Sequence, residues 1–232
     1  GGTESQDWAE MIMRMYIMWG EKNNYNIKTL DIQKSEPAGI KSATLEFEGE
    51  FSFGHLKGEN GVHRLVRISP FDSNAKRHTS FASVFVYPLA DESIEITIDP
   101  SDIKWDTFRS SGAGGQSVNK TESAVRLKHA PTGIIIENSE SRSQLENKTK
   151  AIQLLKSQLY ELELRKKQLE KDKLNVDKKK IEWGSQIRNY VLHPYKMVKD
   201  LRTNYESSNP DAVLNGDLNH FIKSYLMEFG QK

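Results

Sequence analysis

The first hydrophobic residues of the chain recur with the period of an α-helix. Steps of three and four residues separate Trp8, Met11, Ile12, Met15, Tyr16 and Trp19. Because such a stripe lies on one helix face, the pattern predicts a helix whose apolar face is buried in a core. A side-chain oxygen of Thr3 or Asp7 is the expected N-terminal cap of this helix.

Between residues 27 and 100 the pattern changes to the alternation and β-rich composition of strands. The apolar positions are Leu45 and Phe47, Phe51 and Phe53, Phe81 with residues 84–87, and Ile94, Ile96 and Ile98. Pro88 and Pro100 mark the ends of runs, because proline has no N–H for a β-ladder. These runs predict several antiparallel strands that pack against the first helix.

A second unit is predicted after Pro100. Its signals are a glycine-rich loop at residues 112–115, strands around residues 125–129 and 134–136, and a turn between them at residues 131–133. A long helix follows, with an apolar stripe of Ile152, Leu155, Leu159, Leu162 and Leu169 and an expected end at Trp183-Gly184. The tail carries a last helical stripe, formed by Leu214, Leu218, Phe221, Ile222 and Leu226.

Composition excludes several classes of function. Lys and Arg total 33 against 32 for Asp and Glu, so any RNA binding must come from local patches. The absence of cysteine excludes disulfides and thiolate metal sites and fits a reducing cytoplasm. No apolar stretch approaches the roughly 18 residues needed to span a bilayer. A soluble, cytoplasmic protein without a metal or cofactor is expected, and the lack of an initiator methionine predicts an upstream segment.

The segment 111–116, Ser-Gly-Ala-Gly-Gly-Gln, carries the first candidate chemistry. Glycine tolerates positive φ and lets a backbone approach a partner closely, so the loop can present N–H groups to an oxyanion or a phosphate. It lacks the Lys-Ser/Thr end of a P-loop and the glycine spacing of a dinucleotide site. An ordinary surface loop stays the alternative interpretation.

The residues that follow this loop resemble the catalytic domain of the class I peptide chain release factors. The similar segments are residues 117–126, residues 131–133 and Ser-Arg-Ser-Gln at 141–144. In that family the Gly-Gly-Gln loop enters the peptidyl-transferase centre of the ribosome, so the resemblance assigns this catalytic role to Gly114, Gly115 and Gln116. It also implies N5-methylation of Gln116.

An upstream segment resembles the codon-reading region of the type-2 members of this family. Its motifs are Ser-Pro-Phe at 69–71 and His-Thr at 78–79, where type-1 members carry Pro-x-Thr in place of the first. The resemblance assigns recognition of UAA and UGA to Gly1, Glu4, Ser69, Pro70, Phe71, His78 and Thr79. A hydroxyl can donate or accept and so suits either purine, and an imidazole ring can stack on a splayed base.

Other positions are expected to contact ribosomal RNA. Arg64, Arg67 and Arg77 can pair with phosphates, although a surface arginine is more often merely solvated. The resemblance also places Trp183 in a switch loop that packs on RNA of the decoding centre. Most of the Lys-rich run at residues 166–180 is expected to be a solvated helix surface.

The resemblance implies an α+β fold in three parts. Residues 1–99 form an antiparallel-sheet codon-recognition domain, and residues 100–175 form a smaller α/β catalytic domain with the long helix. Residues 176–232 form the switch loop and a C-terminal segment that packs on the codon-recognition domain. The implied partners are both ribosomal subunits, the stop codon of the mRNA, peptidyl-tRNA, a GTPase recycling factor and a glutamine methyltransferase, with no membrane.

Two alternatives and two departures from the family stay open. A codon-independent ribosome-rescue hydrolase shares the glycine loop, and a non-catalytic rRNA-binding assembly protein would leave that loop inert. The loop at residues 72–77 lacks the paired glycines usual in the family, which puts its path in doubt. The family's N-terminal helical domain does not occur in this sequence, so the chain is expected to be a fragment.

Overall fold

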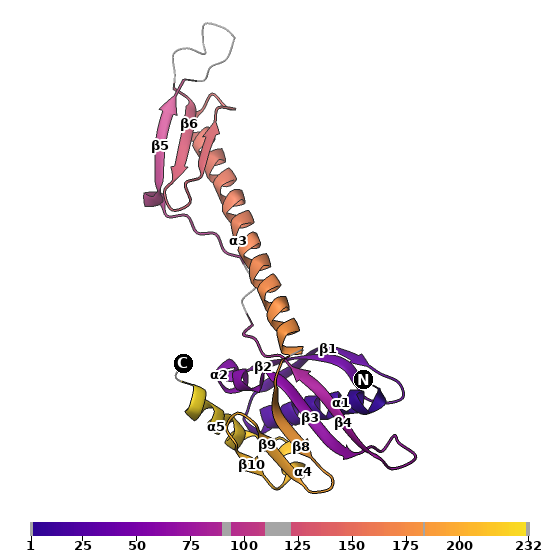
Figure 1. Ribbon diagram of the computed structural model, residues 1–232. Helices are drawn as coiled ribbons and strands as arrows, with labels where there is room; N and C mark the ends of the chain where they lie inside the picture. The colour runs from indigo at the N-terminus through magenta and orange to yellow at the C-terminus, as the bar shows by residue number, and fades with distance from the viewer. Residues whose placement is uncertain (1, 90–93, 110–121, 183, 231–232) are drawn as a thin grey trace. The chain divides into compact units, whose positions relative to one another are not determined.

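The computed structural model describes residues 2–89, 94–109, 122–182 and 184–230 (Figure 1). The chain forms two compact units. The first joins residues 1–89 to residues 174–232, and the second spans residues 90–173. Each unit combines helices with a β-sheet, so the predicted α+β class is confirmed.

Helix α1 (Thr3–Lys22) is the centre of the first unit's core. Its predicted stripe is correct, because Trp8, Met15 and Trp19 have almost no exposed surface. The predicted cap is wrong. Gly2 precedes the helix without a side-chain cap, and its carbonyl accepts the N–H groups of Ser5 and Gln6. Asp7 instead turns to a partner on the neighbouring sheet.

A five-stranded sheet packs on α1 in the order β10-β9-β8-β3-β4. Its strands are β3 (Gly61–Ile68), β4 (Arg77–Val84), β8 (Gln186–Val191), β9 (Met197–Asp200) and β10 (Glu206–Ser207). Neighbouring strands are antiparallel except β3 and β8, which run parallel. The whole second unit separates these two strands in the sequence, so no tight hairpin joins them. The tail therefore completes the sheet of the first unit.

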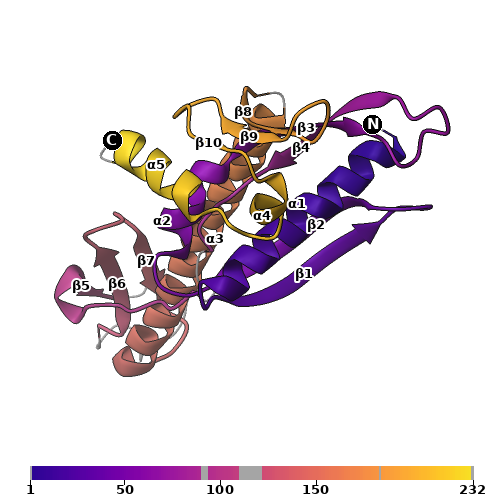
Figure 2. The same cartoon turned by 90° about the horizontal axis from the view of Figure 1, so that it is seen from below.

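Two short helices follow β10 and close the core of the first unit. They are α4 (Pro210–Leu214), which contacts α1, and α5 (Asn219–Phe229) (Figure 2). Asn209 caps α4 by accepting the N–H of Ala212 at 3.1 Å. Three residues of the predicted tail stripe, Leu218, Phe221 and Ile222, are buried.

The hairpin of β1 (Asn26–Lys34) and β2 (Ile40–Glu48) confirms the first predicted strands, but the pattern misled after it. Phe51 and Phe53 belong to no strand, because residues 52–56 form helix α2 (Ser52–Leu56), followed by the 3-10 turn η1 (Lys57–Glu59). Phe51 has a left-handed backbone with φ of 56°, and the residue is 76% exposed.

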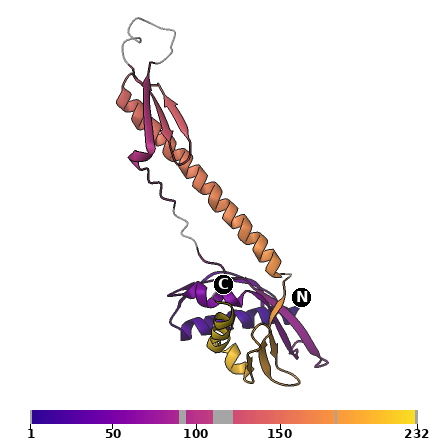
Figure 3. The same ribbon diagram turned by 60° about the vertical axis from the view of Figure 1, so that its left-hand side comes forward.

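The second unit packs a three-stranded antiparallel sheet on helix α3 (Figure 3). Its elements are η2 (Pro100–Asp102), β5 (Ile103–Phe108), β6 (Ala124–His129), β7 (Ile135–Asn138) and most of α3 (Gln144–Glu182), whose residues from 174 on belong to the first unit. Residues 94–98 form no strand, although Ile98 packs on the sheet's core. The helix stripe is buried at Leu155 but solvent-exposed at Leu169. Within the described ranges no helix is long and apolar enough to cross a membrane.

Candidate functional site

The start of α1 and the β3–β4 hairpin bring most of the predicted codon-reading residues together. In the antiparallel register Arg67 lies opposite His78, and Val66 lies opposite Thr79. The loop at residues 69–76 joins the two strands beside the N-terminal turn of α1. Gly1 lies outside the described residues.

Glu4 is the centre of this cluster. Its carboxylate accepts Nε and Nη2 of Arg67 at 2.7 and 3.1 Å, and Arg67 also donates to Asp7 at 2.7 Å. Burial acts to raise the pKa of Glu4, but the hydrogen bonds from Arg67 and Ser69 outweigh it and leave this pKa below its ordinary value. Glu4 is therefore a fixed anion, and the Arg67 cation predicted for RNA contact is already paired with two carboxylates.

Ser69 is held almost completely out of solvent. Its hydroxyl donates to Glu4 Oε2 at 2.8 Å and accepts the N–H of Phe71 at 3.2 Å. Its own N–H donates to the carbonyl of Lys76 across the loop at 3.3 Å. Because a hydroxyl has one proton, Ser69 can offer a base only its remaining acceptor capacity unless Glu4 releases it.

His78 is held by an acidic residue that the sequence did not single out. Its Nε2 lies 2.7 Å from Asp72 Oδ2, and the other carboxylate oxygen of Asp72 accepts the N–H of Asn74 at 2.9 Å. The loop closes through Ala75, which takes a left-handed φ of 51°. The family's usual glycines would suit such a turn, and here an alanine adopts it.

The remaining predicted residues of this surface differ in exposure. Pro70, Arg77 and Thr79 are exposed, and the Phe71 ring is 44% exposed. Arg64 on β3 is half-buried. The loop therefore exposes an aromatic ring, and the start of β4 exposes a cation and a hydroxyl on the two sides of His78 in the sequence. This mixture suits an unpaired nucleotide, whose base can stack and whose phosphate can pair with arginine.

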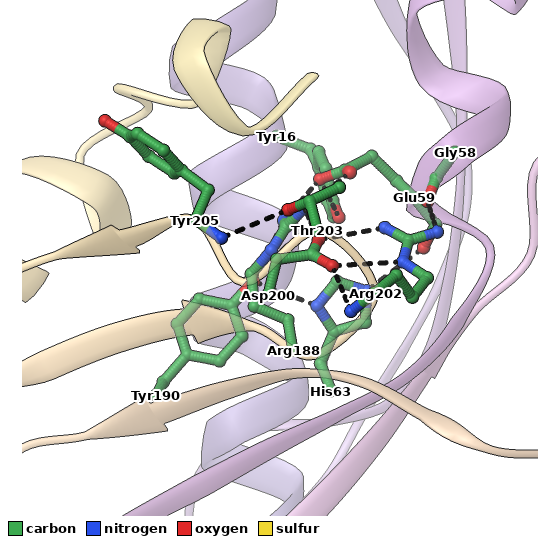
Figure 4. A network of polar contacts seen from close by, with 10 residues as sticks. All are labelled: Tyr16, Gly58, Glu59, His63, Arg188, Tyr190, Asp200, Arg202, Thr203 and Tyr205. Atoms are coloured by element: carbon green, nitrogen blue, oxygen red, sulfur yellow. Dashed lines mark hydrogen bonds and ion pairs between the residues drawn. The ribbon is translucent and has the colours of Figure 1, made fainter. Parts of the chain in front are cut away.

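A buried ionic cluster lies deeper in the first unit, and sequence reasoning missed it (Figure 4). Arg188 on β8 is fully buried and donates to both carboxylate oxygens of Glu59 at 2.6 and 2.8 Å. It also donates to Asp200 on β9 at 3.1 Å, and Arg202 pairs with the same carboxylate. Burial acts to raise the pKa of Glu59, but Arg188 outweighs it and keeps the pKa low.

Hydrogen bonds extend this cluster to α1. His63 donates Nε2–H to the carbonyl of Glu59 at 3.0 Å, so its Nδ1 accepts the hydroxyl of Tyr190 at 2.9 Å. The hydroxyl of Tyr16 donates to Glu59 at 3.0 Å. The cluster thus ties η1, β3, β8 and β9 to the first helix. Except for the partly exposed Arg202 its side chains are buried, and it ties the returning tail to the sheet.

A hollow of about 1010 Å³ lies elsewhere on the first unit. It is lined by the end of α1, the β2–α2 loop and α5, with Tyr25, Phe51 and Met227 among its residues. Since Trp19 in this hollow is roughly 22 Å along the helix from Glu4, the hollow is separate from the candidate site. The Asn219 side chain in this hollow already has partners within the protein, because its oxygen accepts the Trp19 indole N–H at 2.9 Å and its nitrogen donates to Asn23.

The predicted catalytic residues Gly114, Gly115 and Gln116 lie outside the described residues, as does Trp183. The chain that leaves the glycine loop is bound at the start of α3. Gln144 donates to the carbonyl of Glu122 at 2.9 Å, and the buried Asn147 donates to the carbonyl of Ser123 at 2.8 Å. In the part of the chain that the structure describes, no group of acidic or histidine side chains could hold a metal ion.

Comparison with known proteins covers nearly the whole chain. The PCRF domain family matches residues 1–84, and the RF-1 domain family matches residues 92–202. Peptide chain release factor 2 of Petrotoga mobilis is 58% identical over 231 residues, and the Thermotoga maritima protein of the same name is 53% identical over 232. The solved structure of RF2 of Thermus thermophilus aligns with a TM-score of 0.59 at 46% identity.

These relatives are longer than this chain. Each alignment covers 100% of the chain, but only 63% of the two release factor sequences and 66% of the solved one. The Ser-Pro-Phe and Gly-Gly-Gln segments both fall inside the aligned length. The chain belongs to the peptide chain release factor family, and its similarity to release factor 2 extends over its whole length.

Proposed function

We propose that this chain is the codon-reading and catalytic part of a factor that terminates translation. It recognises UAA and UGA in the ribosomal A site and promotes hydrolysis of the peptidyl-tRNA ester. The proposal is carried by the full-length similarity to release factor 2 relatives. The grouping of Glu4, Ser69 and His78 on one surface supports it.

Codon reading uses hydroxyl and ring contacts at the β3–β4 hairpin. Thr79 accepts or donates toward either purine, Ser69 accepts, or donates once Glu4 releases its proton, and His78 stacks on an unstacked base. The start of α1, with Gly1 and Glu4, faces the invariant uridine through helix-terminal N–H groups. Arg64 and Arg77 pair with RNA phosphates. UAA and UGA differ only at the second position, so type-2 specificity requires a site that accepts either purine at the second position and only adenine at the third.

Ester hydrolysis uses a backbone donor in the glycine loop. The reaction passes through a tetrahedral state with negative charge on oxygen, and one preorganised donor at that oxygen contributes about 3–4 kcal/mol. The N–H of Gln116 is that donor, Gly114 and Gly115 give the backbone its freedom, and the Gln116 side chain positions water. The remaining groups belong to the peptidyl-transferase centre, so the chain has no hydrolase activity without the ribosome.

The partners follow from this role. They are the two ribosomal subunits, the mRNA, peptidyl-tRNA, a GTPase recycling factor and a methyltransferase that modifies Gln116. Trp183 acts in the switch between free and codon-bound states by packing on decoding-centre RNA. The site of action is the cytoplasm.

Peptide release from programmed ribosomes tests this proposal. The full-length protein is expected to release labelled peptide when UAA or UGA occupies the A site. It should not release peptide when the mRNA ends in the P site and leaves the A site empty. Release on the truncated mRNA at the rate seen with UAA would instead identify a rescue hydrolase, and ribosome binding without any release would identify an assembly protein.

A further inference from the structure

Asp72 follows the Ser-Pro-Phe motif directly and makes four hydrogen bonds in and beside the β3–β4 loop. Its N–H donates to the carbonyl of Ser69 at 3.4 Å, and its carbonyl accepts the N–H of Ala75 at 3.0 Å. One carboxylate oxygen accepts the N–H of Asn74, and the other lies 2.7 Å from His78 Nε2. The side chain of Asp72 is 18% exposed, so the loop itself fixes the position of this carboxylate.

The contact with His78 determines which ring nitrogen carries a proton. An ionised carboxylate only accepts hydrogen bonds, so Nε2 of His78 must be the donor. The hydrogen bond from His78 also lowers the pKa of Asp72, which keeps the carboxylate ionised. The imidazole is therefore held at one edge, while 42% of the His78 side chain stays exposed.

Other charged groups near this pair lie on β3 and α1. Arg67 on β3 lies directly opposite His78, and Glu4 and Asp7 on α1 bind Arg67. The carboxylates of Glu4 and Asp7 both accept hydrogen bonds from Arg67, and Glu4 also accepts the Ser69 hydroxyl. Among the described residues, Asp72 is thus the carboxylate that hydrogen-bonds to His78.

We propose that Asp72 is a positioning residue for codon reading, which holds the imidazole of His78 by its Nε2–H edge so that the ring face is preset for stacking on a base. This inference rests on the proposed function of the hairpin. Preorganisation of this kind strengthens binding because the ring does not lose its rotational freedom when the codon arrives.

The imidazole ¹⁵N–¹H spectrum of the free full-length protein tests the contact itself. The Nε2–H of His78, assigned by its loss in His78→Gln, is expected to be protected from solvent exchange. Asp72→Ala should abolish that protection, whereas Ser73→Ala, which changes an exposed hydroxyl in the same loop, should leave it. An unprotected Nε2–H in the unaltered protein, or protection that survives Asp72→Ala, would overturn the proposal.

Release kinetics test the consequence. Asp72→Ala should lower kcat/KM for release on UAA and UGA by roughly tenfold, the usual effect of one charge-assisted hydrogen bond, mainly through KM. Asp72→Asn keeps an accepting oxygen and should fall between Asp72→Ala and the unaltered protein. Equal rates for Asp72→Ala and Ser73→Ala would contradict the role. If the unaltered protein released nothing on any codon, the proposed function would fail, and the ring spectrum would still decide the Asp72 contact.

Discussion

The Ser69 hydroxyl donates its single proton to Glu4, and this limits the hydrogen bonds that it can make with a base. The Ser69 hydroxyl lies 2.8 Å from Glu4 Oε2, and Arg67 donates to the same carboxylate. A base that needs a donor from Ser69 must compete with an anion, and a base that offers a donor can bind the free lone pair without that competition. In the proposed function, codon reading at this position therefore depends on Glu4 as well as on Ser69.

Replacing Ser69 with alanine tests this dependence. Ser69→Ala removes the hydroxyl bond to Glu4 and should cost about 1 kcal/mol of folding stability. Release on UAA and UGA should fall by roughly tenfold, a change of about 1.4 kcal/mol in kcat/KM. Ser83→Ala, an exposed serine on the same hairpin, is the control. Equal release by the two variants would show that the Ser69 hydroxyl takes no part in codon reading.

At Gln116 the backbone and the side chain make separable predictions. Gln116→Pro deletes the N–H proposed to face the oxyanion and should lower the rate of peptide release by roughly a hundredfold or more. Gln116→Ala keeps this N–H and should retain most of the rate. Single-turnover release from saturated ribosomes measures both. Full activity in Gln116→Pro would exclude the backbone donor.

At the scale of elements, the buried ion pairs hold the tail to the sheet. Glu59→Ala leaves Arg188 buried without its bidentate partner, which should lower the free energy of unfolding by about 3–5 kcal/mol. Glu206→Ala breaks the pair with Lys199 at 3.5 Å, where both side chains are well exposed, and should change it by less than about 1 kcal/mol. The free energy of unfolding of each variant is measured by urea titration, and the opening of β8 is measured by amide hydrogen exchange. A loss for Glu59→Ala as small as the control's would contradict the cluster's structural role.

The same cluster predicts how stability depends on pH. Burial and the nearby Arg188 cation lower the pKa of His63 from 6.5 to about 4. Between these values the unfolded chain binds a proton that the folded chain refuses, so stability should fall as the pH drops through this window, by about 1.4 kcal/mol per pH unit. His63→Gln should flatten that slope, and His193→Gln, an exposed histidine, should not. A slope unchanged by His63→Gln would exclude His63 as its source.

Sequence patterns predicted the elements whose two faces differ. The stripe of α1 and the alternation in β6 are correct, because burial on one side repeats with the period of the element. The same reasoning failed at Phe51 and Phe53, whose alternation belongs to an exposed helical turn. It also failed at residues 94–98, since alternation alone does not supply a partner strand.

The sequence predicted the motif residues of the site but not the side chains that bind them. The Ser-Pro-Phe and His-Thr segments identified the hairpin, but nothing local links Asp72 to His78 across the loop. Arg188 and Glu59 are 129 positions apart, so their pairing depends on the parallel docking of β8 beside β3. The strand β8, Gln-Ile-Arg-Asn-Tyr-Val, is half polar, so nothing in its local pattern marked Arg188 as buried.

At the scale of the whole molecule, the two proposed tasks fall in two separate units. The hairpin that groups Glu4, Ser69 and His78 belongs to the first unit, and the glycine loop at residues 112–115 belongs to the second. Neither task is useful alone, because codon reading without hydrolysis stalls a ribosome and hydrolysis without reading truncates proteins. The alignment with release factor 2 relatives spans both segments, which supports the proposal that they serve one function.

The ratio of release rates on different codons tests this joint function most directly. The full-length protein is measured on ribosomes that differ only in the A-site triplet, with UAA, UGA, UAG and one sense codon. The account predicts rapid release on UAA and UGA and a kcat/KM at least about a hundredfold lower on UAG and the sense codon, a difference of about 2.7 kcal/mol. Equal kcat/KM on UGA and UAG would contradict it.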